Sequence, residues 1–417
     1  MVSGLIQETL RAIPALFANR LAAFAVVAFL GGWLGPAALG KYLFAVGVIQ
    51  IACVAGGLGL TTAGVRLLPL YIQDGERHLF RGFIRFAGLA VVLASAGVGL
   101  SLSLGAHAYL ESEASLPSVW WIATLISIGL LLNGIFRSVG FTWLATIPQG
   151  SFRSLATLSL AGLGLVIVGE LTSRHAVLAF GGATLLGVLL QLLVGGRGRR
   201  ALFLDQAEYR PREWLGTGMQ YYPMDLARAI SLHGPTIALR LLESSEAAGH
   251  YGAVMALVNF LLIPERAGLV AAQRQFAPRF RSGGLREIEP LLITLTQVSL
   301  VIGVPTLVGF TVFPHLFLSL VSSDFVEAGA LVPILGAATF LGALNLLPLS
   351  ALSMTQHVTF ARRFSVTTQM LGIAVAVIAI QNGGIYAVAW TLLGITCLRS
   401  TVLATYWATR RGQEPGR

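Results

Sequence analysis

Long apolar stretches follow one another along almost the whole chain, and they constrain its fold more than any other feature. Twelve of them approach the roughly 20 residues that a helix needs to cross a bilayer. They lie at 12–33, 42–60, 83–105, 117–136, 154–171, 176–194, 219–241, 252–270, 290–312, 330–352, 364–381 and 386–407. Only 11% of the residues are charged, against roughly 25% in a soluble domain. The sequence therefore predicts an all-α, polytopic membrane protein with about 12 transmembrane helices, and it excludes a soluble enzyme.

The basic residues indicate how the predicted helices are oriented. If the N-terminus is cytoplasmic, the cytoplasmic connectors contain 22 of the 28 Lys and Arg residues. The outer connectors contain Lys41, Arg174 and Arg240, and the remaining three basic residues lie within predicted spans. Because Lys and Arg accumulate in cytoplasmic loops, this asymmetry predicts that both termini are cytoplasmic. It also explains the net charge of +10 without a nucleic-acid partner.

The sequence has no pattern typical of a catalytic, cofactor or metal site. Its single lysine lies in Gly40-Lys41-Tyr42, so the chain lacks the Gly-Lys-Ser/Thr loop of a P-loop ATPase. Cys53 and Cys397 lie in apolar runs, and the seven histidines show no metal-ligand spacing. We therefore expect no enzyme activity, no cofactor and no metal ion.

The two halves of the sequence resemble each other when one is shifted by 209 residues. Glycines and prolines, which mark backbone geometry rather than general apolarity, coincide at corresponding turns and kinks. The matching pairs are Pro14 and Pro223, Gly40 and Gly249, Gly59 and Gly268, and Pro69 and Pro278. The sequence thus predicts two parallel six-helix repeats, a bundle at 1–196 and a bundle at 215–417, joined by a cytoplasmic linker at 197–214.

Short motifs around the first turn resemble those of a known family. Trp33-Leu34-Gly35-Pro36 with Gly40-Lys41-Tyr42 is similar to its "LGP…GxY" turn. Gly57-Leu58-Gly59-Leu60, followed by Arg66, is similar to the end of its second helix. In the second half, Ser244 to Tyr251 and then Pro278 resembles the same feature, with Ser244-Ser245 in place of the Gly-Pro pair. The family comprises the O-antigen and exopolysaccharide flippases of the multidrug/oligosaccharidyl-lipid/polysaccharide exporter (MOP) superfamily.

This resemblance implies a function. Two six-helix bundles in the bacterial inner membrane would move a polyprenyl-diphosphate-linked oligosaccharide from the cytoplasmic to the outer leaflet by alternating access. The anionic diphosphate would be held in a cationic cavity. The implied partners are this lipid-linked glycan, membrane lipids and other polysaccharide assembly proteins.

Arginines within the predicted spans are the strongest candidates for a substrate site, because a charge at the centre of a membrane helix costs at least about 2.5–3.5 kcal/mol. Arg20 lies beside Asn19 in the first span, and Arg228 lies one position from the equivalent of Arg20 in the second half. Their two guanidinium groups would bind a diphosphate from both sides. In the alternative interpretation, Arg228 pairs with Asp225, and Arg20 extends to the membrane surface or binds helix-end carbonyls.

Polar residues elsewhere extend this candidate site. Gln50 and Asn259 coincide under the repeat, and their amides would either bind sugar hydroxyls or join helices. Arg66 and Arg85 lie near cytoplasmic helix ends. There they would either attract the substrate's diphosphate at the cytoplasmic mouth or only follow the charge bias of cytoplasmic loops.

Two further functions compete with the flippase. A cation-coupled multidrug exporter of the same superfamily needs carboxylates within the membrane, and Asp225 is the clear candidate. Asp225 is equally the candidate for ion coupling in a flippase. A scaffold for envelope-glycan enzymes, the third possibility, would tolerate substitution of Arg20 and Arg228.

Overall fold

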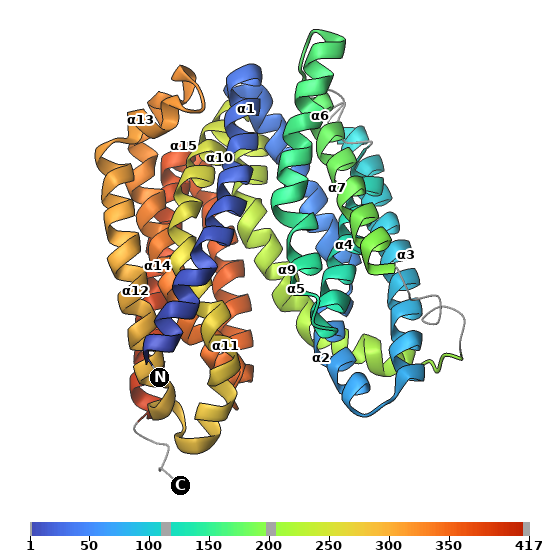
Figure 1. Ribbon diagram of the computed structural model, residues 1–417. Helices are drawn as coiled ribbons and strands as arrows, with labels where there is room; N and C mark the ends of the chain where they lie inside the picture. The colour runs from blue at the N-terminus through green and yellow to red at the C-terminus, as the bar shows by residue number, and fades with distance from the viewer. Residues whose placement is uncertain (1, 110–117, 197–205, 412–417) are drawn as a thin grey trace. The chain divides into compact units, whose positions relative to one another are not determined.

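The computed structural model describes residues 2–109, 118–196 and 206–411, and the regular structure in these ranges is entirely helical. In chain order the elements are α1 (Val2–Gly56), α2 (Leu60–Gln73), α3 (Arg77–Tyr109), α4 (Val119–Ser138), α5 (Thr142–Thr146), η2 (Pro148–Phe152), α6 (Arg153–Val168), α7 (Ser173–Gly196), α9 (Pro211–Leu242), α10 (Ser245–Val258), η3 (Asn259–Leu262), α11 (Ile263–Gly283), α12 (Leu285–Val312), α13 (Pro314–Ser319), η4 (Ser323–Ala330), α14 (Leu331–Ser353) and α15 (Val358–Arg411). The predicted all-α class is confirmed (Figure 1).

Two of the long helices are each broken by glycine. In α1 the backbone of Gly35 has φ 73° and ψ 174°, a conformation that residues with a Cβ rarely adopt. Pro36 follows and starts a new helix, which is a favourable position for proline. In α15 the break lies at Gly383 and Gly384, with φ 59° at Gly384. These breaks separate the predicted spans 12–33 and 42–60, and the spans 364–381 and 386–407.

The twelve predicted spans correspond to observed helices. Within the described residues, nine segments are long and apolar enough to cross a membrane, and α1 and α15 each count once although each contains two helices. The remaining span is α9, which has 32 residues and is more polar. Apolar side chains also cover the outside, since Val166 is 82% and Val301 is 73% exposed. Such a surface is suited to lipid and not to water, so the chain is a multi-pass membrane protein.

The described helices form two compact units that differ from the contiguous bundles 1–196 and 215–417. Unit 1 comprises residues 1–36 and 241–417, and unit 2 comprises residues 37–240. The opening helix of each half therefore packs with the other five helices of the opposite half. A close backbone approach shows this in unit 1, where a Cβ on Gly249 would lie 2.0 Å from the Pro36 carbonyl oxygen.

The linker predicted at 197–214 is described only in part. Residues 197–205 lie outside the described ranges, and α9 has already begun at Pro211. The last residues of the predicted linker thus belong to the first turn of a helix that packs in unit 2.

Trp214 fixes the first turns of α9 to α2 and α3 within unit 2. Its indole is fully buried, and Nε1 donates a hydrogen bond to the phenol oxygen of Tyr71 at 3.0 Å. The indole also meets the Phe83 ring edge to face, with centroids 5.5 Å apart. These side chains belong to one hydrophobic cluster, so the helix that carries Asp225 and Arg228 starts from a rigid anchor.

A chain of amides joins α7 to α4 and η2 in the same unit. Gln191 is fully buried, and its Nε2 donates to Asn133 Oδ1 at 2.6 Å and to the Leu144 carbonyl at 3.2 Å. Its Oε1 accepts from Gln149 Nε2 at 3.3 Å. The amide is therefore fully paired, as a polar group within a membrane bundle must be.

In unit 1, α14 is the central helix and packs against α10, α11, α12 and α15 (Figure 1). Buried apolar residues of α11, α12 and α14 form its core, including Phe276, Leu295 and Leu347. One polar bond crosses the contact with α15, where Asn345 Nδ2 donates to the Thr396 carbonyl at 3.3 Å.

Candidate functional site

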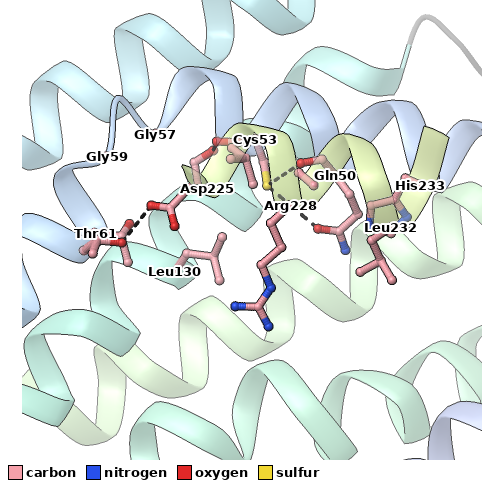
Figure 2. A pocket seen from close by; sticks show the side chains of 14 residues that line it. Gln50, Cys53, Gly57, Gly59, Thr61, Leu130, Asp225, Arg228, Leu232 and His233 are labelled. Carbon is pink, nitrogen blue, oxygen red and sulfur yellow. Dashed lines mark hydrogen bonds between the residues drawn. The ribbon is translucent and has the colours of Figure 1, made fainter. Parts of the chain in front are cut away.

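A cavity of about 350 Å³ lies within unit 2, between the second helix of α1, α2, α4 and α9. Its polar lining includes Ser127. It also includes Gln50, Asp225, Arg228 and His233, which are labelled in Figure 2. Three of these, Gln50, Asp225 and Arg228, are residues that the sequence singled out. The fold thus brings together side chains that lie more than 170 residues apart in the chain.

The backbone between α1 and α2 shapes one end of this cavity. Gly59 has φ 67°, and a Cβ there would lie 2.1 Å from the carbonyl oxygen of Gly218 in α9. Glycine is required on both counts, for the left-handed conformation and for the contact. The close approach brings the start of α2 beside α9.

This approach places Thr62 against Asp225. The Thr62 hydroxyl donates to Asp225 Oδ2 at 2.8 Å. Asp225 and Arg228 form no ion pair in the structure, although their charges are near enough to attract. The alternative interpretation of the sequence, in which Asp225 neutralises Arg228 by direct pairing, does not describe this geometry.

Arg228 extends into the cavity away from Asp225 (Figure 2). Its side chain is exposed, and no described residue forms a hydrogen bond or salt bridge with its guanidinium. A guanidinium presents five donors in a fixed fork that suits phosphate and carboxylate oxygens. The cavity therefore offers a complete anion-binding group.

Gln50 is oriented by its neighbours on α1 and α4. The Cys53 thiol donates to the Gln50 carbonyl at 3.1 Å and approaches its Oε1 at 3.8 Å. Ser127 Oγ in turn donates to the Cys53 carbonyl at 3.1 Å. The amide nitrogen of Gln50 is left without a partner among the described residues, so it can donate to a ligand.

Three predicted site residues lie in unit 1 and not in this cavity: Arg20 and Asn19 in α1, and Asn259 at the start of η3. Arg20 is half-buried, and no described residue gives it a hydrogen bond or a carboxylate partner. The positive charge of Arg266 on α11 repels it. Unit 1 therefore also holds an uncompensated guanidinium within a membrane helix.

The two residues predicted at the cytoplasmic mouth lie in unit 2, outside the cavity. The Arg66 guanidinium donates a hydrogen bond to the phenol oxygen of Tyr221, which joins α2 to α9. Arg85 is half-buried on α3. Their proposed contact with the substrate remains a prediction.

The sequence interpretation missed several polar residues of the cavity, among them Thr62, Ser127 and His233. Nothing in the local sequence distinguishes Thr62 from other threonines, because its role depends on the packing of α2 against α9. His233 had a signal, since an ionisable residue within a membrane helix indicates function. Among the described residues no group of His, Cys, Asp or Glu could hold a metal ion.

Known membrane transporters are similar to this chain in sequence or in fold. The succinoglycan biosynthesis transport protein ExoT of Rhizobium meliloti (strain 1021) is 27% identical over 301 residues, which cover 69% of this chain and 56% of ExoT. The structure of the inward-facing conformation of a multidrug resistance MATE family transporter of the MOP superfamily aligns with a TM-score of 0.71 and 12% identity, covering 95% of this chain and 94% of that one. The chain has the fold of these MATE transporters.

Further comparisons agree with this fold. A MATE transporter in complex with MaD3S aligns with a TM-score of 0.67 at 13% identity, covering 99% of this chain and 96% of that one. No protein-family model matches the chain. The chain spans a little more than half the length of ExoT.

Proposed function

We propose that this protein is a flippase of the MOP superfamily, which moves a polyprenyl-diphosphate-linked oligosaccharide from the cytoplasmic to the outer leaflet of a bacterial inner membrane by alternating access. The observation that carries the proposal is Arg228, whose guanidinium extends into a cavity without any protein acceptor among the described residues. Both termini would be cytoplasmic, and other polysaccharide assembly proteins would supply and use the glycan.

An uncompensated cation in a membrane helix is costly to maintain. A charged residue at a helix centre costs at least about 2.5–3.5 kcal/mol. An anionic ligand offsets this cost, and a diphosphate accepts paired hydrogen bonds from a guanidinium. Arg20, which has no hydrogen-bond acceptor among the described residues, supplies a second guanidinium in unit 1.

Neutral groups in the same cavity suit a sugar. The free amide nitrogen of Gln50 would donate to a sugar hydroxyl, and Asn259 would do the same in unit 1. The likeness to ExoT, whose name describes transport in succinoglycan biosynthesis, supports a polysaccharide substrate.

The direct test is to extract lipid-linked glycans from cells that lack this protein and analyse them by mass spectrometry. Accumulation of a polyprenyl-diphosphate oligosaccharide, with loss of the matching surface polymer, is the expected result. Complementation with Arg228→Gln should restore export about 10–100-fold less well than the native chain, because hydrogen bonds to charged groups are worth about 1.5–3 kcal/mol.

Arg212 provides a matched control on the same helix. It lies exposed in the first turn of α9, outside the cavity, so Arg212→Gln should complement fully. An unchanged glycan profile in the deletion strain, with no second flippase present, would contradict the proposal. Equal complementation by the two variants would remove Arg228 from the site.

A cation-coupled multidrug exporter is the second candidate, and one observation favours it. Asp225 faces the same cavity with its carboxylate oriented by the Thr62 hydroxyl, and a carboxylate there could bind a proton, a sodium ion or a cationic drug. Asp225→Asn would then abolish drug resistance and leave the glycans unchanged. In the flippase, Asp225 would instead couple transport to an ion gradient. A transport rate that does not change with pH and is the same in Asp225→Asn would exclude that coupling role.

A further inference from the structure

A second cavity, of about 390 Å³, lies entirely within unit 1. It is enclosed by the first helix of α1, by α10, η3 and α11, and by α12 and α13. Aromatic rings form much of its wall: Phe260 meets Phe17 and Phe24 edge to face, with centroids 5.6 and 6.0 Å apart. On the far side, Phe310 and Phe317 are 4.8 Å apart.

The lining of this cavity is almost purely hydrocarbon. Thr306 is the one polar side chain among the described lining residues, and its hydroxyl already donates to the Ile302 carbonyl at 2.8 Å. The cavity therefore offers no free donor or acceptor from a side chain. It can bind only an apolar group.

A cation lies on the same face of α1 as this apolar wall. Arg20 follows Phe17 by three residues and precedes Phe24 by four, which are the spacings that place side chains together on a helix. No described residue forms a hydrogen bond or an ion pair with Arg20, and the positive charge of Arg266 on α11 repels it. An apolar cavity and an uncompensated positive charge thus lie side by side.

The depth of Arg20 distinguishes between lipids. Arg20 lies eight residues from the nearer end of the apolar span 12–33, about 12 Å along a helix that rises 1.5 Å per residue. A resident phospholipid keeps its phosphate at the membrane surface and cannot place it there. A lipid whose phosphate is carried across the bilayer must pass this depth.

We propose that the cavity of unit 1 binds the hydrocarbon chain of the transported prenyl lipid while its diphosphate contacts Arg20. This inference rests on the proposed function and adds a second part to the substrate site: an apolar subsite for the lipid. Because each buried methylene contributes about 0.8 kcal/mol, the chain supplies binding energy that the cations alone do not.

The test uses the whole protein in phospholipid nanodiscs with a prenyl diphosphate that carries a diazirine at the end of its chain. After irradiation, labelled peptides are identified by mass spectrometry. The label should concentrate on α1, α12 and α13 of unit 1. Labelling spread evenly over the lipid-exposed helices would overturn the proposal. So would equal labelling of the same peptides by a phospholipid with a diazirine acyl chain.

Two substitutions on α12 sharpen the test. Thr306→Trp fills the cavity, whereas Val304→Trp places the same side chain at a position that is 41% exposed and does not line the cavity. We expect Thr306→Trp to reduce labelling at least fivefold and Val304→Trp to leave it unchanged. Leu21→Trp, from the opposite wall, serves as a second filling variant in case Thr306→Trp fails to fold. Undiminished labelling in a folded filling variant would refute the subsite.

Failure of this inference can be separated from failure of the proposed function. Geranyl diphosphate, whose chain is too short to fill the cavity, reports binding of the diphosphate alone. If it binds the native chain, is lost in Arg20→Gln and is unaffected by Thr306→Trp, while the long probe labels elsewhere, the flippase stands and the subsite falls. If lipid-linked glycans do not accumulate in the deletion strain, the function itself is wrong.

Discussion

Removing the Trp214 anchor should destabilise unit 2 more than any change at the cavity surface. Trp214 is 0% exposed, and its indole meets Phe83 at 5.5 Å and Phe86 at 5.6 Å between centroids. Trp214→Ala removes this packing and leaves a void, which costs about 3–5 kcal/mol for a buried tryptophan. Trp214→Phe keeps most of the packing and loses the hydrogen bond to Tyr71, so we expect a loss of about 1–3 kcal/mol.

The assay is reversible unfolding in mixed micelles of dodecyl sulfate and dodecyl maltoside, followed by far-ultraviolet circular dichroism. A double-mutant cycle of Trp214→Phe and Tyr71→Phe isolates the hydrogen bond, and its coupling energy should be about 0.5–1.5 kcal/mol. Strict additivity of the two single variants would show that the 3.0 Å contact contributes nothing. A loss below about 1 kcal/mol for Trp214→Ala would refute the idea that this residue anchors α9.

Three other features of unit 2 can be tested by substitution. Gly59→Ala should lower the free energy of unfolding by about 2–5 kcal/mol, because it combines a strained positive φ with a 2.1 Å contact to Gly218. The control Gly75→Ala has φ 74° but open space around it, so it should lower the free energy of unfolding by only about 1–2 kcal/mol. Equal losses for the two variants in thermal unfolding would contradict the contact argument. Gln191→Leu should lower the free energy of unfolding by about 2–4 kcal/mol, because it leaves the amides of Asn133 and Gln149 without their hydrogen-bond partner. No change in the same unfolding assay would show that water takes over these hydrogen bonds. Burial raises the pKa of the Tyr71 phenol above its usual 10.0, so the neutral phenol is favoured in the folded state. The contribution of Tyr71 to the free energy of unfolding is therefore complete below pH 10 and is lost as the pH rises further. The difference in stability between the native chain and Tyr71→Phe should shrink above pH 10. A difference that stays constant with pH would refute the raised pKa of Tyr71.

The spans and their breaks could be predicted because their causes are local. A run of apolar residues identifies a membrane helix without knowledge of its neighbours. Gly35 and Pro36 break α1, and Gly383 with Gly384 breaks α15, where the residue types themselves dictate the backbone. The same locality made the in-span charges Arg20, Asp225 and Arg228 visible, since any charge in such a run is conspicuous.

The contacts of these residues could not be predicted in the same way. Thr62 contacts Asp225, which lies 163 residues away in the sequence. The sequence around Thr62 contains no signal that predicts this contact. The alternative pairing of Asp225 with Arg228 was based on helical spacing, but the Thr62 hydroxyl donates to the carboxylate and the guanidinium extends into the cavity.

The sequence alone thus determined the class, the twelve helices, the repeat and the charged candidates, because burial in lipid acts on each helix separately. Tertiary structure alone decided how the helices are grouped. The opening helix of each half packs with the remaining helices of the other, so Arg20 belongs to unit 1 and Arg228 to unit 2. Lipid-facing helices are uniformly apolar, and hydropathy therefore cannot encode their neighbours. The neighbours of each helix are set instead by close backbone contacts at glycine, such as Gly249 with Pro36 and Gly59 with Gly218. These contacts depend on the side-chain volume and backbone shape of both helices, so one helix sequence alone does not reveal them.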